Sequence, residues 1–205
     1  MNIAVIGTGN IGGGLARAWS RKGHRIFLGT RSPINKALRD LVAYNEDLIS
    51  AHAPEVAVKK ADVILLAVPA DVAFDVVSKL GDTEGKIIID AMNAVFRKPE
   101  GYLRTSEAIQ AASADSRIVK AFNMIGAENM DNPQYGETVA DMFICGNGED
   151  DKIIVAQLAE DAGFRVFDVG GLDMELPLEH LALIWGKLAY ESGLGREIAF
   201  KVLQR

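Results

Sequence analysis

Short apolar runs alternate along the chain with longer stretches in which apolar residues recur at helical spacing. The short runs are mostly aliphatic at consecutive positions, which is typical of strands buried on both faces of a parallel sheet. They span residues 3–6, 25–28, 56–58, 63–68, 86–90, 117–121, 142–145 and 164–168. Between the first two runs, one helical face is formed by Ile11, Leu15, Ala18 and Trp19. This alternation of strands and helices predicts an α/β fold.

The first six runs fit a Rossmann-type sheet, doubly wound and mostly parallel, that ends near residue 124. Residues 125–205 add two strands, a helix over about 149–162 and a helical segment from about residue 175. This second part is short, so we expect it to pack on the sheet rather than to fold independently. We therefore predict one compact domain over residues 1–205, with a core at 1–124 and a C-terminal α/β extension at 125–205.

Length and composition exclude several classes of protein. The chain has 205 residues, of which 49% are hydrophobic and 24% charged, so it can bury a large core and is neither collagen-like nor disordered. Its single cysteine, Cys145, lies in an apolar run and reads as a small core residue. The N-terminus lacks a basic leader, and no apolar stretch approaches the roughly 20 residues that span a bilayer. We expect a cytoplasmic protein without membrane insertion.

Charge is distributed unevenly along the chain. Residues 1–39 hold seven Lys/Arg and no carboxylate, whereas the remaining 166 residues hold 15 Lys/Arg and 28 Asp/Glu. The basic segment lacks interleaved aromatic residues, so it does not resemble a nucleic-acid-binding arm. A basic segment that surrounds a glycine-rich loop suits a small molecule carrying phosphate.

The glycine-rich loop has the pattern G-x-G-x-x-G and stands between the first strand and the first helix. Its residues are Gly7, Thr8, Gly9, Asn10, Ile11 and Gly12. In such loops the first glycine permits a tight turn, the second lets the backbone approach a pyrophosphate, and the third lets the helix pack close to the strand. The helix N-terminus adds unpaired N–H groups. The motif in this context predicts dinucleotide binding, although a glycine-rich turn without a ligand is the alternative.

The end of the second strand favours NADP(H) over NAD(H). An NAD-preferring site places Asp or Glu there to bind the ribose hydroxyls, but this chain has Thr30, Arg31 and Ser32, with Lys36 one helical turn further on. The Arg31 guanidinium can stack on adenine and donate to a 2′-phosphate, and the hydroxyls add donors. The alternative is that Arg31 is an ordinary surface residue of a loop.

Polar or turn-forming residues also follow three later strands, at the sheet edge where open α/β sheets bind ligands. Ala67, Val68 and Pro69 stand at the end of the fourth run, Asn93 comes after the fifth and Asn123 after the sixth. Asn93 and Asn123 are candidates to orient nicotinamide or ribose through amide hydrogen bonds. Because Asn favours turns, capping of loop backbone is an equal alternative for each.

Other catalytic chemistry is poorly represented. The three histidines, His24, His52 and His180, stand at no metal-ligand spacing, and no tyrosine is followed four residues later by lysine. We therefore expect no metal site and identify no catalytic acid or base.

Several segments together resemble the NADPH-dependent coenzyme F420 reductase family. They are the glycine loop, residues 29–31, the Lys-x-Phe-Asn segment at 120–123 with Gly126 and Ala127, and residues 192–197. The chain is also similar to the cytosolic NADPH-binding domain of the six-transmembrane metalloreductases, chiefly in Lys-x-Phe-Asn and in residues 176–178. Three features depart from these relatives. Phe122 stands where deazaflavin reductases often have His, no basic cluster for an acidic F420 tail is evident, and we expect no counterpart of the metalloreductases' membrane domain in this sequence.

The resemblance implies hydride transfer between NADP(H) and a flavin-type acceptor such as F420, FMN or FAD, or a ferric or quinone species reached through flavin. It also implies that nicotinamide lies near the ends of the fifth and sixth strands, close to Ala127, and that the C-terminal helix lines the acceptor pocket. Such transfer needs little acid–base chemistry from the protein. The alternatives are a dehydrogenase of a small carbonyl or imine and a non-catalytic NADPH sensor. A homodimer is compatible with the apolar C-terminal part.

Overall fold

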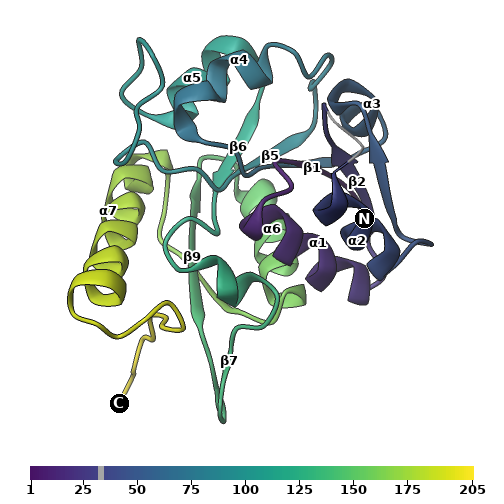
Figure 1. Ribbon diagram of the computed structural model, residues 1–205. Helices are drawn as coiled ribbons and strands as arrows, with labels where there is room; N and C mark the ends of the chain where they lie inside the picture. Colours follow the sequence, from purple (N-terminus) through teal and green to yellow (C-terminus); the bar gives the residue numbers. More distant parts are fainter. Residues whose placement is uncertain (32–34) are drawn as a thin grey trace.

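The computed structural model of the protein describes residues 1–31 and 35–205. In this part of the chain an eight-stranded sheet has the order β10-β9-β6-β5-β4-β1-β2-β3 (Figure 1). The strands are β1 (Asn2–Ile6), β2 (Arg25–Gly29), β3 (Ile49–His52), β4 (Val63–Leu66), β5 (Ile87–Asp90), β6 (Arg117–Lys120), β9 (Asp141–Gly146) and β10 (Arg165–Asp168). Strands β1 to β6 are parallel, whereas β9 runs antiparallel to β6 and parallel to β10.

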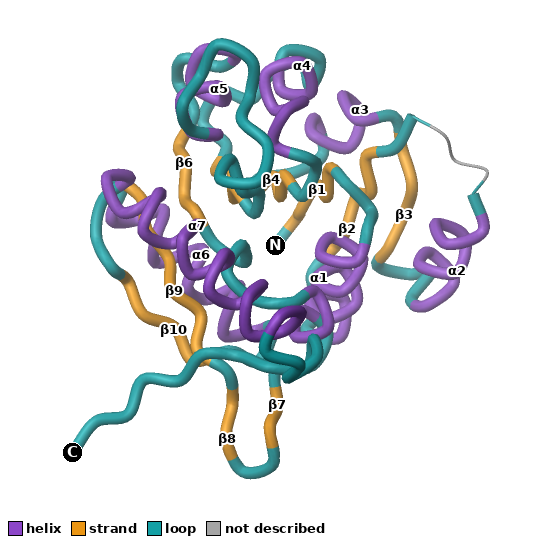
Figure 2. The backbone as a smooth tube through the Cα atoms, turned by 60° about the vertical axis from the view of Figure 1, so that its left-hand side comes forward, coloured by secondary structure: helices purple, strands orange, loops and turns teal. Residues whose placement is uncertain are grey.

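Helices cover both faces of this sheet (Figure 2). One face carries α1 (Asn10–Arg21), α2 (Lys36–Tyr44) and α6 (Glu149–Asp161), and the other carries α3 (Pro54–Lys59), α4 (Ala73–Val77) and α5 (Thr105–Ala112). The last helix, α7 (Glu175–Gly186), continues into a wider turn at Lys187–Glu191. Smaller elements are η1 (Ala70–Val72), η2 (Ala127–Met130), β7 (Gln134–Tyr135), β8 (Thr138–Val139) and η3 (Leu172–Met174).

A hydrophobic core fills the space on each side of the sheet. On the α1 side, the Trp19 indole is fully buried and donates a hydrogen bond to the carbonyl oxygen of Leu158 at 2.7 Å, which ties α1 to α6. The Phe122 ring packs edge-on against Trp19, with centroids 5.9 Å apart. These contacts fix the first helix against the C-terminal extension.

The expected Rossmann-type fold is confirmed, with the two predicted C-terminal strands extending the same sheet. Strand β9 pairs with β6 through Val119 opposite Gly146 and Lys120 opposite Cys145, and Cys145 is buried as expected. The division of the chain at residue 124 stays a prediction. No helix within the described ranges has both the length and the apolar character that a bilayer span requires.

The strand predicted over residues 56–58 is wrong. These residues lie in α3, and the third strand is β3, directly before it. Pro54 occupies the first helical position, where its missing N–H costs nothing, and Glu55 complements the helix N-terminus. This short helix contains two β-branched valines, and its sequence pattern therefore resembles that of a strand. The edge strand β3 is only partly buried, so its apolar pattern is weak.

The strand order reverses between β1 and β4, because the chain proceeds outward through β2 and β3 before it returns to β4. In open α/β sheets a ligand crevice forms at this point, beyond the carboxyl ends of the strands. The loops after β1 and β4 border the crevice, and those after β5 and β6 lie further along the same edge.

Candidate functional site

Gly7 makes the turn that leaves β1, and two independent constraints require glycine there. Its φ is +102°, a left-handed conformation that L side chains rarely adopt. A Cβ at this position would lie 2.3 Å from the carbonyl oxygen of Ala67 and 3.1 Å from Val68 Cγ1. The loops after β1 and β4 therefore touch through backbone at the crevice.

Gly9 and Gly12 differ in what surrounds them. A Cβ on Gly12 would lie 2.0 Å from the Gly7 carbonyl oxygen and 2.9 Å from Val5 Cγ1, so α1 packs directly on the strand. Gly9 precedes α1, and a Cβ there would meet nothing within 4 Å. The loop is thus closed toward the protein and open at Gly9, beside the N–H groups of the first helical turn, which have no partner within a helix. An anion fits this arrangement.

The other motif residues frame that opening. Thr8 is half-buried and Asn10 is exposed at the start of α1. Ile11 is partly buried, packs against the core and also lines the pocket beside Asn93 and Asn123. The first turn of α1 contains no acidic residue that would compete with an anion.

The end of β2 carries the residues predicted to select the dinucleotide. Thr30 is half-buried, and its N–H donates to the carbonyl oxygen of His52 in β3 at 3.0 Å. Arg31 is exposed and forms no ion pair with any residue of 1–31 or 35–205. Lys36 is the exposed first residue of α2. Ser32 lies outside the described residues.

The loop after β4 forms the second wall of the crevice. Ala67 and Val68 are half-buried, Pro69 is exposed, and the Ala67 N–H donates to the Ile6 carbonyl oxygen at 2.9 Å. This bond continues the β1–β4 pairing by one residue. It thereby holds Ala67 against Gly7.

Asn93 and Asn123 face each other across the loops that follow β5 and β6. The Asn93 amide nitrogen donates to the Asn123 backbone carbonyl oxygen at 2.8 Å, and the Asn123 amide nitrogen donates to Asn93 Oδ1 at 2.9 Å. Asn123 Oδ1 is buried and has no partner among the described residues. A buried acceptor of this kind is costly unless a ligand or water donates to it.

The backbone conformation of Phe122 helps to set the position of the next residue, Asn123. Its φ is +62°, the only positive value at a non-glycine residue in the described chain. Such a conformation costs about 1 to 3 kcal/mol for a non-glycine residue and persists only where surrounding contacts hold it. The buried ring, held between Trp19 and Phe164, supplies those contacts. The Phe122 side chain consequently points into the core and away from the pocket.

A pocket of about 420 Å³ opens beside Asn93 and Asn123. Its lining comes from the loops after β5 and β6, from the start of α1 and from α7 with the segment that follows. The residues are Ile11, Asn93, Phe96, Asn123, Met124, Ile125, Gly126, Ala127, Ala182, Leu183, Trp185, Gly186, Lys187, Tyr190, Glu191 and Arg196. A Cβ on Gly126 would lie 2.5 Å from Trp185 Cζ2, so the β6 loop and α7 are in close contact. The walls are largely apolar and aromatic.

Both cations that line this pocket are paired. Lys187 bonds to Glu191, and Arg196 bonds to Glu128 while lying 5.4 Å from the centroid of the Trp185 ring. The hydrogen bonds from Arg196 lower the pKa of Glu128, so that carboxylate stays ionised. The pocket thus offers a largely apolar space, and neither of the cations that line it is unpaired.

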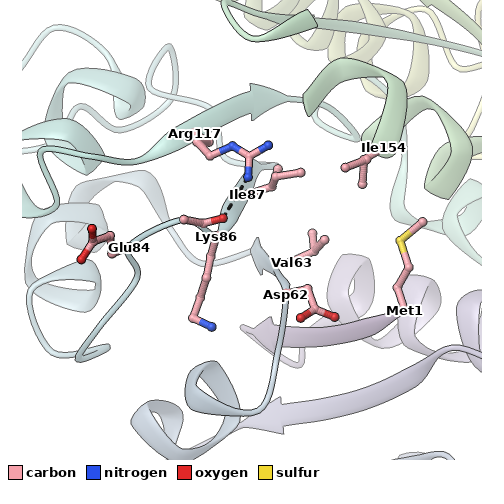
Figure 3. A pocket seen from close by; sticks show the side chains of 9 residues that line it. Met1, Asp62, Val63, Glu84, Lys86, Ile87, Arg117 and Ile154 are labelled. Atoms are coloured by element: carbon pink, nitrogen blue, oxygen red, sulfur yellow. Dashed lines mark hydrogen bonds between the residues drawn. The ribbon is translucent and has the colours of Figure 1, made fainter. Parts of the chain in front are cut away.

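A second cavity, of about 430 Å³, lies at the opposite edge of the sheet (Figure 3). It is bordered by Met1, Asp62, Lys86 and Arg117, near the amino ends of the strands. Both of its cations have partners: Arg117 donates to the Gly85 carbonyl oxygen at 2.9 Å, and Lys86 donates to the Ala61 carbonyl oxygen at 2.6 Å. This cavity is remote from the glycine loop and from both asparagines.

A buried ionic cluster lies behind the two asparagines and was not identified as a site from the sequence. Its centre is Lys120 at the end of β6, a residue quoted above only as part of a motif. Asp90 from β5 and Glu175 and Glu179 from α7 surround it. The available signal was a lysine that ends an aliphatic strand.

Comparisons with known proteins agree with this geometry. Residues 2–94 match the family model described as NADP oxidoreductase, coenzyme F420-dependent. The chain is 29% identical to an F420-dependent NADP reductase of Methanocaldococcus jannaschii, over 94% of this chain and 95% of that protein. It is also 27% identical to the metalloreductase STEAP2 of Homo sapiens. That alignment covers 89% of this chain and 36% of STEAP2.

Solved structures show the same fold. A protein from Arthrobacter sp. FB24 has a TM-score of 0.86 at 23% identity, with both chains fully covered. The hypothetical protein SMa0349 from Sinorhizobium meliloti has a TM-score of 0.74 at 29% identity, over 86% of this chain and 88% of that one. The sequence and structure comparisons together confirm the resemblance stated from the sequence.

Proposed function

We propose that this chain, an NADP-dependent oxidoreductase similar to the F420 reductases, transfers hydride between NADP(H) and a flavin-type acceptor. The coarser assignment rests on the family model and the relative that matches over nearly its full length. The acceptor and the roles of individual residues are our proposals. The observation that carries them is the apolar pocket that joins the glycine-loop helix, the paired asparagines and α7.

In this proposal the glycine loop binds the pyrophosphate of NADP(H). The space beside Gly9 admits the phosphates, and the unpaired N–H groups at the start of α1 donate to them. Arg31 and Lys36 hold the 2′-phosphate, since both are exposed at the end of β2 and the start of α2. Thr30 contributes a hydroxyl donor at the end of β2, and we propose the same role for Ser32 from its place in the sequence alone.

Nicotinamide orientation falls to the asparagine pair. Asn123 lines the pocket, and its Oδ1 is an acceptor without a partner among the described residues. A carboxamide NH₂ group supplies the missing donor. Asn93 acts through Asn123, because its two hydrogen bonds fix both the backbone and the amide of that residue. Ala67, Val68 and Pro69 border the ring from the β4 side, and Ala127 borders it from the β6 side.

The acceptor occupies the rest of the pocket, against α7. Reduced nicotinamide supplies a hydride when its ring lies roughly 3 to 3.5 Å from the acceptor atom. The protein's part is to orient the two rings and exclude water, which the apolar walls at Met124, Ile125 and Leu183 accomplish. Because Lys187 and Arg196 are already paired, the binding energy comes from the ring system rather than from an acidic tail.

Steady-state NADPH oxidation with a panel of acceptors tests the proposal. Riboflavin, FMN, F420 and a quinone are compared with a cyclic imine and a 2-keto acid, each at saturating NADPH. We expect turnover with the flavin-type ring systems and none with the imine or the keto acid. Turnover confined to the imine or keto acid, or NADPH binding without turnover on any acceptor, rejects the flavin-type assignment.

A further inference from the structure

A lysine with three carboxyl groups is buried directly behind the proposed nicotinamide site. Lys120 Nζ lies 2.6 Å from Glu179 Oε1, 3.1 Å from Asp90 Oδ2 and 3.6 Å from Glu175 Oε1. The side chain of Lys120 is fully buried, and those of the three acids are 0 to 1% exposed. This cluster of Lys120, Asp90, Glu175 and Glu179 is called the Lys120 cluster below.

The acids also anchor neighbouring backbone and hydroxyl groups. Asp90 accepts the Met92 N–H at 2.9 Å, and Glu179 accepts the Val95 N–H at 2.9 Å. Glu175 accepts from the Thr105 hydroxyl at 2.9 Å and from the Ser106 N–H at 3.2 Å, both at the start of α5. The Thr105 hydroxyl also contacts Asp90 and accepts from Lys120 at 3.0 Å.

Three of the segments that the Lys120 cluster holds lead into the pocket, whereas the fourth, the start of α5, does not line it. Asn93 and Phe96 lie in the loop fixed by the Met92 and Val95 bonds. Asn123 follows Lys120 by three residues. Ala182, Leu183 and Trp185 lie one to two turns after Glu179 on α7. One buried ammonium thus joins the β5 loop, the β6 loop and α7, which are three walls of the pocket.

The cluster is an expensive way to stabilise a fold. Burial of charge is opposed by desolvation, and apolar residues of similar volume often stabilise a core as well or better. Burial raises the pKa of Asp90, and the nearby Lys120 ammonium reverses this only in part. Burial lowers the pKa of Lys120, but the surrounding carboxylates raise it by more, so the lysine stays charged. Unlike apolar packing, the hydrogen bonds and ion pairs of this cluster are directional and fix the positions of specific atoms.

We infer that Lys120 is a positioning residue, whose buried ammonium holds α7 and the β5 loop at the spacing that hydride transfer across the pocket requires. The inference rests on the proposed function for its kinetic consequence, although its structural consequence is independent of turnover. Lys120 touches neither the pocket nor the glycine loop, so it acts through Glu179, Asp90 and the Asn93–Asn123 pair.

Lys120→Met tests this role, with Lys152→Met as the matched control. Lys152 is also a buried lysine between two carboxylates, Glu149 at 2.8 Å and Asp168 at 2.7 Å, but it lies on α6 and lines neither cavity. Hydrogen–deuterium exchange is measured along the full chain, together with the Kd for NADPH and the kcat and KM for riboflavin.

We expect Lys120→Met to raise exchange by about tenfold or more in residues 91–96 and 175–186, while α1 changes by less than about threefold. The KM for riboflavin rises by about tenfold, and the Kd for NADPH stays within about threefold. Lys152→Met leaves residues 91–96 and 175–186 and the KM for riboflavin unchanged. If Lys120 were purely structural, Lys120→Met would raise exchange throughout the chain and would change the Kd for NADPH and the KM for riboflavin together.

Glu179→Gln serves if Lys120→Met does not fold, because the amide keeps the shape of the side chain and an oxygen for hydrogen bonding. It is expected to raise exchange in residues 91–96 and 175–186, and the KM for riboflavin, by about threefold. Uniform exchange across the chain, or unchanged exchange in α7, overturns the positioning role. If the parent protein reduces no flavin, the proposed function fails, and the exchange pattern alone decides whether Lys120 holds α7.

Discussion

Asn93 and Asn123 hold each other in place through two hydrogen bonds, at 2.8 and 2.9 Å, that join the loops after β5 and β6. The pairing uses both donors that face across the gap and leaves Asn123 Oδ1 buried without a partner among the described residues. Sequence reasoning left two roles open for each asparagine. The structure shows the pairing between the loops, and contact with nicotinamide remains the proposal for Asn123.

Asn123→Leu is expected to impair transfer more than binding. The substitution keeps the volume but removes the acceptor proposed for the carboxamide, so the single-turnover rate falls by about 10- to 100-fold, or roughly 1.4 to 2.8 kcal/mol. The Kd for NADPH changes by less than about fivefold, because the adenosine half of the site is untouched. Stopped-flow oxidation of NADPH by riboflavin measures the rate. Asn93→Leu retains Asn123 Oδ1, so its single-turnover rate should fall by less. An equal fall in rate for the two variants would contradict a direct contact between Asn123 and the carboxamide.

Arg31→Ala is expected to weaken NADPH selectively. Charge-assisted hydrogen bonds contribute about 1.5 to 3 kcal/mol each, so the Kd for NADPH rises by roughly 10- to 150-fold while that for NADH is nearly unchanged. Isothermal titration calorimetry with both dinucleotides measures this. Arg39→Ala, an exposed arginine on α2, is the control and should alter neither Kd. Parallel losses for the two dinucleotides would remove Arg31 from the 2′-phosphate site.

Gly9→Val and Gly12→Val should fail in different ways. A Cβ at Gly9 meets nothing within 4 Å, so Gly9→Val folds normally and loses affinity for both NADPH and NADH by filling the pyrophosphate space. A Cβ at Gly12 would lie 2.0 Å from the Gly7 carbonyl oxygen, so Gly12→Val unfolds the Gly7–α1 region. Circular dichroism and fluorescence titration separate the two results. Normal NADPH affinity in folded Gly9→Val would contradict the pyrophosphate assignment.

Gly186→Trp tests the acceptor pocket. Gly186 lies at the end of α7, lines the pocket and has open space at its Cβ position, so an indole there occupies the pocket without a backbone clash. The KM for riboflavin is expected to rise by about tenfold or more, with the Kd for NADPH within about threefold. Gly186→Ala, which adds one methyl group, is the control. Unchanged riboflavin kinetics in Gly186→Trp would place the acceptor elsewhere.

The C-terminal segment should loosen in acid through Asp141. Burial raises the pKa of this carboxyl, but hydrogen bonds from Arg165, Lys201 and the Val202 N–H lower it by more, so the net shift is downward. The stability that Asp141 contributes is therefore present above its ordinary value of 3.8 and is lost as the pH falls below it. Hydrogen exchange in residues 196–205 should rise below about pH 4.

Asp141→Asn should reproduce that loosening at neutral pH. The amide cannot accept from Arg165, Lys201 and Val202 at once, so the free energy of unfolding falls by about 1 to 3 kcal/mol. Thermal unfolding measured at pH 7 provides the test. A variant with parent-like stability and an unchanged C-terminal exchange pattern would show that Asp141 does not hold this segment.

The parts of the fold with strong local signals were predictable from the sequence. The glycine loop lies between a buried strand and an amphipathic helix, and α6 and α7 begin within a residue or two of their predicted starts. The error at residues 56–58 arose where six residues form a helix with β-branched side chains. Such a segment is too short for its helical period to be distinguished from a strand.

The candidate site was predictable only in its outline. Residue types at strand ends indicated Asn93 and Asn123, but their pairing depends on the relative heights of two loops that no local pattern encodes. The Lys120 cluster joins Lys120 to Glu179, 59 positions further along the chain, and its α7 members resemble ordinary helix-surface acids. The positive φ of Phe122 is likewise set by packing against Trp19 and Phe164 and not by local preference.

Anaerobic stopped-flow mixing of the NADPH-loaded protein with oxidised flavin tests the hydride-transfer proposal most directly, using NADPH deuterated at either face of the nicotinamide C4. We expect the absorbance of reduced nicotinamide and of oxidised flavin to fall with one shared rate constant, and deuterium on one face alone to slow both. Loss of neither absorbance with riboflavin, FMN or F420, although NADPH binds, would contradict hydride transfer to a flavin-type acceptor.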